Sequence, residues 1–98
     1  MIIKIHQSYR LTIAICDSDL IGQKFEDENR QLDLTGAFFK GDEKSTQEIV
    51  EIMADMKRED ATFFIVGKES VNLALQTGLI LKKGIITIQE IPVSLVLL

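Results

Sequence analysis

A cysteine followed by an aspartate is the first place where side chains of this sequence could do chemistry. Cys16 and Asp17 close a run of β-branched residues, just before a segment that is suited to start a helical turn. A thiol near a helix N-terminus can be acidic and nucleophilic, and His6 on the preceding strand is the kind of base that it would need. The alternative is a small buried cysteine beside a helix-capping aspartate. The usual burial of cysteine favours this alternative.

A glycine between a strand and a helix is the second such place. Gly67 follows Thr-Phe-Phe-Ile-Val and precedes Lys-Glu-Ser at an expected helix start. Helix N-termini attract anions, but the segment lacks the first glycine and the hydroxyl residue of a phosphate-binding loop. In addition, Glu69 would repel a phosphate. We therefore interpret Gly67 as the residue that lets the strand meet the helix closely.

Two aromatic residues between glycines form the third feature. Phe38 and Phe39 precede Lys40 and Gly41 in an expected loop. Exposed rings of this kind can stack on a base or form the centre of a protein contact. The alternative is that the rings fill the core beneath the loop. Adjacent side chains in a loop seldom both point inward, so the sequence leaves both interpretations open.

The other titratable residues form no metal-binding or catalytic pattern. The chain has one cysteine and one histidine, which excludes a disulfide within it and a multi-cysteine or histidine-rich zinc site. The acidic runs Glu26–Glu28 and Asp42–Glu43 lack EF-hand spacing, and we interpret them as solvated loop charge. We expect no catalytic constellation, no metal and no cofactor.

Several motifs together resemble a known family. Their order and spacing are similar to those of an archaeal family of small uncharacterised proteins, domain of unknown function 424, over nearly the whole chain. The motifs are Cys16-Asp-x-x-Leu20-x-Gly22, Phe38-Phe39-Lys40-Gly41, and Val66-Gly67-x-Glu69-Ser70-Val71 with Gly78-Leu79-Ile80. The resemblance implies an α+β fold and no established activity, so no catalytic residue is carried over.

The candidate functional or interaction residues follow from these motifs. They are Cys16, Asp17, Asp19, Gly22, Phe38, Phe39, Lys40, Gly41, Gly67, Glu69 and Ser70. The chain departs from the family near its end, where members often read Val-Pro-His and this sequence has Ile91-Pro92-Val93. If that histidine has a chemical role in the family, this chain lacks it, which weakens the hypothesis of a shared enzymatic activity.

The elements that must position these residues indicate a small α+β domain. The pattern predicts an N-terminal β-hairpin and a mixed or antiparallel sheet with two main helices on one face. Ser45 and Glu48 form a capping box at the start of the first helix, which ends near Lys57-Arg58. The expected strands span residues 1–8, 11–16, 31–35, 62–66, 85–89 and 93–98, and the second helix spans residues 69–77.

Composition sets the class of protein and of partner. The 98 residues are 46% hydrophobic and 27% charged, which fits one globular domain over residues 1–98. The chain has 11 basic and 15 acidic residues, a net charge of −4. We therefore expect weak binding of generic nucleic acids, although a local basic patch stays open. The N-terminus lacks a signal peptide and no apolar run is long enough to span a membrane, so we expect a cytoplasmic protein.

The leading functional hypothesis is a non-enzymatic protein-interaction module in a cytoplasmic complex. Small size and the archaeal resemblance suggest an information-processing complex. The apolar segment from Val93 to Leu98 lacks polar alternation, and Pro92 cannot donate to a ladder. We therefore expect an exposed edge strand that a second copy covers in a symmetric homodimer. The competing interpretation places this segment centrally under both helices and leaves a monomer.

Two other function classes stay open. One is an RNA- or ribosome-associated protein that uses Lys40, Lys44 and the Phe38-Phe39 loop, which would show a steep salt dependence of binding. The other is a small enzyme or ligand binder centred on Cys16/Asp17 and the Gly67 turn, which would need an exposed thiol in a pocket.

Overall fold

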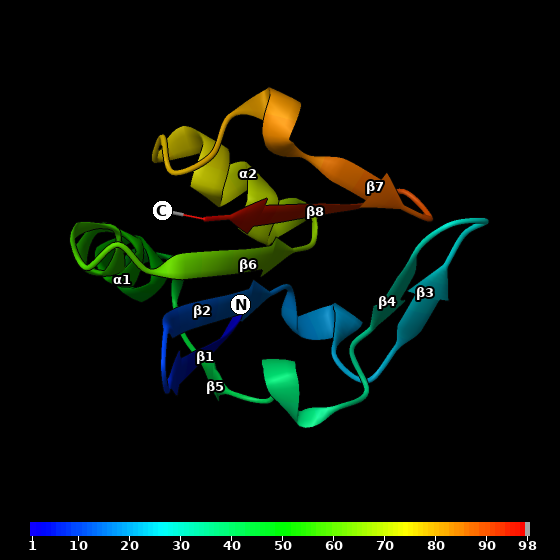
Figure 1. The fold of residues 1–98 in the computed structure, drawn as a ribbon, viewed down its shortest axis with the longest axis horizontal. Coiled ribbons are helices and arrows are strands. Elements are labelled where there is room, and N and C mark those ends of the chain that lie inside the picture. Colours follow the sequence, from blue (N-terminus) through cyan, green and yellow to red (C-terminus); the bar gives the residue numbers. More distant parts are fainter. Residues whose placement is uncertain (98) are drawn as a thin grey trace.

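A six-stranded mixed sheet forms the centre of the molecule in the computed structural model, which describes residues 1–97 (Figure 1). The strand order is β5-β1-β2-β6-β8-β7. β2 and β6 are parallel, whereas the other neighbouring pairs are antiparallel. The bounds are β1 (Ile2–Gln7), β2 (Leu11–Cys16), β5 (Asp42–Glu43), β6 (Thr62–Val66), β7 (Ile86–Ile88) and β8 (Ile91–Val96). The predicted α+β class, N-terminal hairpin and mixed sheet are confirmed.

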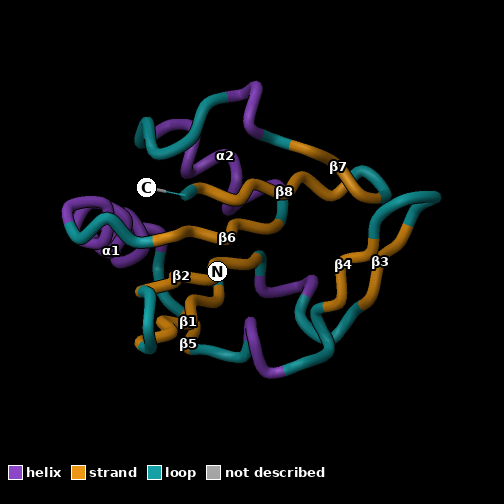
Figure 2. Tube along the Cα trace, in the orientation of Figure 1, coloured by secondary structure: helices purple, strands orange, loops and turns teal. Residues whose placement is uncertain are grey.

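Two helices cover one face of this sheet (Figure 2). α1 (Thr46–Arg58) provides the crossover that the parallel pairing of β2 and β6 requires, and α2 (Lys68–Gln76) follows β6 directly. The buried side chains Ile49 and Val71 of the helices pack with Ile13, Phe63 and Ile65 of the strands in one core. The prediction of two helices on one face is confirmed.

The opposite face is only partly covered. A small hairpin of β3 (Lys24–Glu26) and β4 (Gln31–Asp33) and the 3-10 turn η2 (Ala37–Phe39) pack against one end of it. Leu32 and Phe39 are buried there against Cys16 and Val66. The sequence pattern predicted β4 but missed β3 and β5, because strands of two or three residues are too short for a visible alternation.

The position of the C-terminal strand corrects one expectation. β8 lies between β6 and β7. Its first half, which contains Pro92, is paired with β7, so the strand as a whole is not the expected edge strand. The missing N–H of Pro92 is tolerated because β6 has ended at this level. Only the carbonyl of Pro92 is used there, accepting from the N–H of Gly67 at 2.9 Å.

The capping box of α1 forms as predicted. The backbone N–H of Glu48 donates to Ser45 Oγ at 3.2 Å, and the N–H of Ser45 donates to Glu48 Oε1 at 3.0 Å. These two bonds satisfy donors that the first helical turn would otherwise leave free. Neither helix in the described part of the chain has the length and apolar character to cross a membrane.

Ser45→Ala should lower the free energy of unfolding by about 1 kcal/mol, because it removes this cap. For a domain of this size, that corresponds to a drop of roughly 4–8 °C in the melting temperature. Gln47→Ala is the matched control, since Gln47 is exposed in the same turn and its side chain donates to Glu51 rather than to a backbone group of the cap. Equal melting temperatures for Ser45→Ala and the wild type would contradict the prediction.

Candidate functional site

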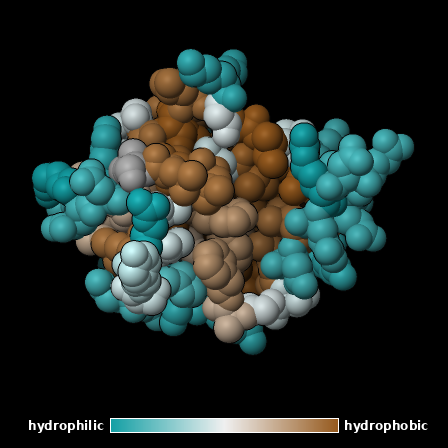
Figure 3. Space-filling model, in the orientation of Figure 1, coloured by the Kyte–Doolittle hydropathy of each residue, from teal (hydrophilic) through white to brown (hydrophobic). Residues whose placement is uncertain are grey.

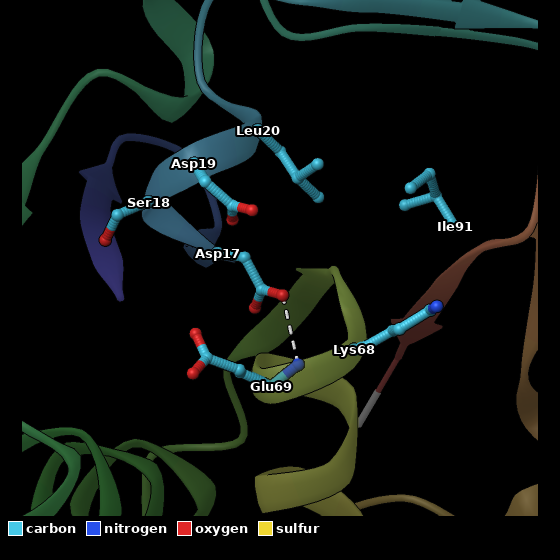
Figure 4. A pocket seen from close by; sticks show the side chains of 7 residues that line it. All are labelled: Asp17, Ser18, Asp19, Leu20, Lys68, Glu69 and Ile91. Carbon is cyan, nitrogen blue, oxygen red and sulfur yellow. Dashed lines mark hydrogen bonds between the residues drawn. The ribbon is translucent and has the colours of Figure 1, made fainter.

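The carboxylate of Asp17 joins the end of β2 to the start of α2. Its oxygens accept from the N–H of Glu69 at 3.0 Å, the N–H of Ser70 at 2.8 Å and Ser70 Oγ at 2.7 Å (Figure 4 draws the bond to Glu69). Asp17 and Ser70 are buried. Asp17 is therefore the N-terminal cap of α2, supplied by the residue that follows β2 rather than by the residue before the helix.

Gly67 makes this contact possible. Its φ of +107° belongs to the left-handed region, and a Cβ at this position would overlap the Asp17 carboxylate. Its N–H binds the Pro92 carbonyl, while the N–H of Asp17 binds the Val66 carbonyl at 3.0 Å. Its positive φ and the close approach of Asp17 both require a glycine, which confirms the interpretation of Gly67 as the residue that lets strand and helix meet closely.

Cys16 is fully buried. Burial, and then the negative charges of Asp17 and Asp19, raise the pKa of its thiol to about 12. A thiol with that pKa is neutral near pH 7 and is a poor nucleophile. Its Sγ lies 3.4 Å from the Asp17 carbonyl oxygen, to which it donates.

The histidine that could activate this thiol lies at the other end of the hairpin. His6 pairs with Thr12, whereas Cys16 pairs with Ile2. Alternation places His6 and Cys16 on the same face of the sheet, but four residues of strand separate them, which is roughly 13 Å. His6 Nε2 instead lies 2.8 Å from the carbonyl oxygen of Phe38. The structure therefore does not bring a cysteine–histidine pair together.

A pocket of about 490 Å³ opens above the Asp17 cap (Figure 4). Its residues are Asp17, Ser18, Asp19, Leu20, Lys68, Glu69 and Ile91. Its polar side chains are largely occupied or exposed: Asp17 caps α2, and Ser18 Oγ donates to Glu43 at 2.6 Å. Hydrogen bonds from the N-terminal ammonium and then from Ser18 lower the pKa of Glu43. Asp19, Lys68 and Glu69 are solvent-exposed charges at the rim.

The aromatic loop divides its two rings between surface and core. Phe38 is 42% exposed and Phe39 only 4%, so each of the two open interpretations holds for one ring. Phe38 stacks on His6 with ring centroids 4.5 Å apart, and it meets Phe64 edge to face at 5.9 Å. No sequence pattern predicts the stack with His6, which lies on a strand 32 residues before Phe38.

The remaining candidate residues are structural or lie apart from the Asp17 pocket. A Cβ on Gly41 would overlap the carbonyl of Ile3, so this glycine lets the loop cross β1. Gly22 has a φ of +87° and donates to the Leu34 carbonyl at 2.9 Å. Lys40 lines a separate groove beside β1. Within residues 1–97, no three His, Cys, Asp or Glu side chains gather as metal ligands.

Comparisons with known proteins place the chain in a family. The family model described as "Protein of unknown function (DUF424)" matches residues 6–97. The chain belongs to the DUF424 family. The expected resemblance is thereby confirmed.

A crystal structure of an uncharacterized conserved protein from Methanopyrus kandleri has the same fold. Its TM-score is 0.83 at 18% sequence identity, covering 97% of this chain and 88% of that one. At this identity the likeness concerns the fold alone. No curated protein matches the chain.

Asp17→Ala should lower the free energy of unfolding by about 2–4 kcal/mol. The change removes the cap of α2 and leaves buried donors on Ser70 without an acceptor. Chemical denaturation measures the loss. Asp19→Ala is the control, because Asp19 is an exposed neighbour in the same turn. Equal effects of the two substitutions would show that the Asp17 cap carries no stability.

Cys16 should react slowly with a thiol reagent in the native protein. Burial and the raised thiol pKa predict a labelling rate at pH 8 that is at least about 100-fold below that of the chain unfolded in urea. The reagent's absorbance over time measures both rates. Rapid stoichiometric labelling of the native protein would contradict the burial and would favour the enzyme hypothesis.

Proposed function

We propose that this DUF424 protein is a non-enzymatic protein-interaction module that acts in a cytoplasmic complex. The observation that carries the proposal is a row of exposed apolar side chains across the open face of the sheet. The exposed row consists of Phe38, Phe64, Leu95 and Ile86, of which Phe64 is half-buried and the other three are exposed. Its members come from η2, β6, β8 and β7.

The strand register makes this row continuous. Phe38 contacts Phe64, and Phe64 is the cross-strand partner of Leu95. Ile86 is paired with Val93, two residues before Leu95 on the same face. Phe38, Ile86 and Leu95 are 42%, 45% and 55% exposed. Large apolar side chains that are contiguous and exposed on a small protein are typical of a docking surface.

The surroundings of the exposed row indicate the chemistry of the partner. Apolar side chains gather over the middle of this face, and polar ones surround them (Figure 3). The β3–β4 hairpin borders the face, held by a bond from Arg30 Nη1 to the Thr87 carbonyl at 3.2 Å. The tip of the hairpin carries the exposed acidic run Glu26–Glu28. A protein segment with apolar side chains at its centre and basic residues toward the hairpin is complementary to this arrangement.

The environments of the potentially reactive side chains support a binding role over an enzymatic one. Asp17 caps a helix, and the thiol of Cys16 is buried with a raised pKa. Catalysis by a nucleophile needs a thiolate, hydroxyl or carboxylate that is free and next to a base. The one hydroxyl next to a carboxylate in the lining of this pocket is Ser18, which donates to Glu43. Hydrogen bonds from the N-terminal ammonium and from Ser18 lower the pKa of Glu43, which makes it a weak base.

One observation favours RNA as a second candidate partner. Lys4, Lys40 and Lys44 line one groove beside β1, although the chain as a whole is acidic. The exposed ring of Phe38 lies two residues from Lys40. A ring for stacking and ammonium groups for phosphates are the two components of a single-strand binding surface. The protein partner is preferred because the exposed row itself contains no basic residue.

Phe38→Asp should abolish the stoichiometric partner that a tagged wild-type chain retains from a native extract. The charge would lie in the centre of the contact and cost about 2 kcal/mol or more of binding, at least roughly 30-fold in affinity. Tyr9→Asp is the matched control, an exposed aromatic in the turn between β1 and β2. Binding of the purified partner to both variants gives the affinities.

The same experiment separates the two partner classes. Retention that persists after nuclease treatment and is lost only in Phe38→Asp supports a protein partner. Retention that nuclease abolishes, and that falls steeply as the salt concentration rises, contradicts the protein partner and supports an RNA partner. Equal binding of Phe38→Asp and Tyr9→Asp would refute the exposed row as the docking surface.

A further inference from the structure

The second half of β8 has an edge that no strand of residues 1–97 occupies. The ladder between β7 and β8 pairs Ile88 with Ile91 and ends where Ile86 pairs with Val93. Before Ile86 the chain leaves the ladder through the 3-10 turn η3 (Lys82–Gly84), which lies beside β8, where the Gly84 carbonyl accepts from Ser94 Oγ at 3.2 Å. On the other side, β6 pairs with β8 as far as Val96. The segment after Val93 is therefore paired on the β6 side only.

The direction of the backbone groups on this edge follows from one hydrogen bond. Pro92 directs its carbonyl toward β6, where it accepts from Gly67. Successive residues of an antiparallel strand direct their backbone groups to alternate sides. Ser94 and Val96 thus face β6, whereas Leu95 and Leu97 direct N–H and C=O toward the unoccupied edge. Unpaired groups of this kind are a template for another strand.

An apolar groove runs along this edge. Its volume is about 300 Å³, and it lies between β8 and the segment from Leu79 to Gly84. Leu81, Leu95 and Leu97 are 65%, 55% and 67% exposed, the largest fractions among the exposed aliphatic side chains. A strand added at this edge would place side chains alternately beside Leu95 on the open face and against Leu81 in the groove.

We propose that a second copy of this chain occupies the edge, with the two β8 strands antiparallel about a twofold axis through Val96. Leu95 of each copy then exchanges both backbone hydrogen bonds with Leu97 of the other. The two sheets join into one, and the exposed rows of both copies become continuous. The inference rests on the proposed function, since Leu95 belongs both to the exposed row and to this edge, and a second copy is one partner of the proposed interaction module.

Three properties of the segment favour a second copy over another occupant. The outward-facing residues, Leu95 and Leu97, are symmetric about Val96, so the segment is its own complement. Residues 91–97 contain no charge, so the paired strands themselves bring no like charges together, and the charged residue that lines the groove beside them is a basic one, Lys83. Pairing over about three residues buries less than the ~800 Å² per partner of a standard interface. Interfaces of this size are typical of weak, transient complexes, so we expect the dimer to form only at high protein concentration.

Sedimentation of the full chain from 1 to 500 µM tests the association. The expected mass rises from 11.0 kDa toward twice that value as concentration increases. Leu95→Asp should hold the mass at the monomer value, because each introduced charge would lie against Leu97 of the other copy and about 7–8 Å from the second introduced charge on the diagonal. Ile5→Asp is the matched control, an exposed isoleucine (45%) at the opposite side of the sheet that should still dimerise.

A cysteine cross-link tests the register. Val96 opposes itself across the twofold axis as a non-hydrogen-bonded pair, with Cα atoms about 4.5 Å apart, within the range that a disulfide spans. Val96→Cys should therefore oxidise to a covalent dimer. Leu95→Cys should not, because the two copies of this position lie about 7–8 Å apart on the diagonal. Native Cys16 is buried and stays reduced. Thermal melts establish that each variant is folded.

The results separate this inference from the proposed function. A concentration-dependent dimer that Leu95→Asp abolishes, together with the Val96→Cys cross-link, supports the inference. A monomer at 500 µM, or a dimer that Leu95→Asp leaves intact, overturns it. A dimer that cross-links through Leu95→Cys and not Val96→Cys overturns the register. The retention experiment with Phe38→Asp decides the proposed function separately.

Discussion

The carboxylate of Asp17 is the interaction on which the rest of the architecture depends. It accepts three hydrogen bonds from the first turn of α2, and it fixes where β2 ends relative to where α2 begins. Gly67 lies against this carboxylate, and its N–H donates a hydrogen bond to the Pro92 carbonyl. One buried side chain therefore aligns β2, β6 and β8 at one end of the sheet, together with the helix that packs beneath them.

This arrangement separates the two faces of the sheet in their roles. On the helix side, α1 and α2 bury the apolar side chains of the strands almost completely. On the other side, the β3–β4 hairpin and Phe39 cover only one end, and the rest stays open. Cys16 and Asp17, the residues that look reactive in the sequence, have structural roles at the covered end: Cys16 is buried in the core, and Asp17 caps α2. The surface that is free for a partner consists of apolar side chains, which can contribute to binding through burial but not to catalysis.

The sequence predicted the features whose causes are local. The capping box of α1 is legible because Ser45 and Glu48 are three residues apart, and the hairpin of β1 and β2 follows from two alternating runs with a short turn. The cap of α2 was not predictable as such, because Asp17 and Ser70 are separated by 53 residues. Pro92 was misplaced for a related reason: whether its missing N–H matters depends on where β6 ends. The stack of His6 on Phe38 likewise depends on which loop crosses which strand.

The parallel pairing of β2 with β6 has a consequence for the order in which the chain acquires structure. The paired residues, such as Thr12 and Thr62, are 50 positions apart, and the cap of α2 comes from the same early strand. During synthesis the N-terminal hairpin emerges first and can close by itself, since its contacts are local. The C-terminal half, by contrast, reaches neither its helix cap nor its sheet partner without that hairpin. The hairpin thus acts as an internal template, and a chain that lacks it leaves β6 and β8 as an exposed apolar pair.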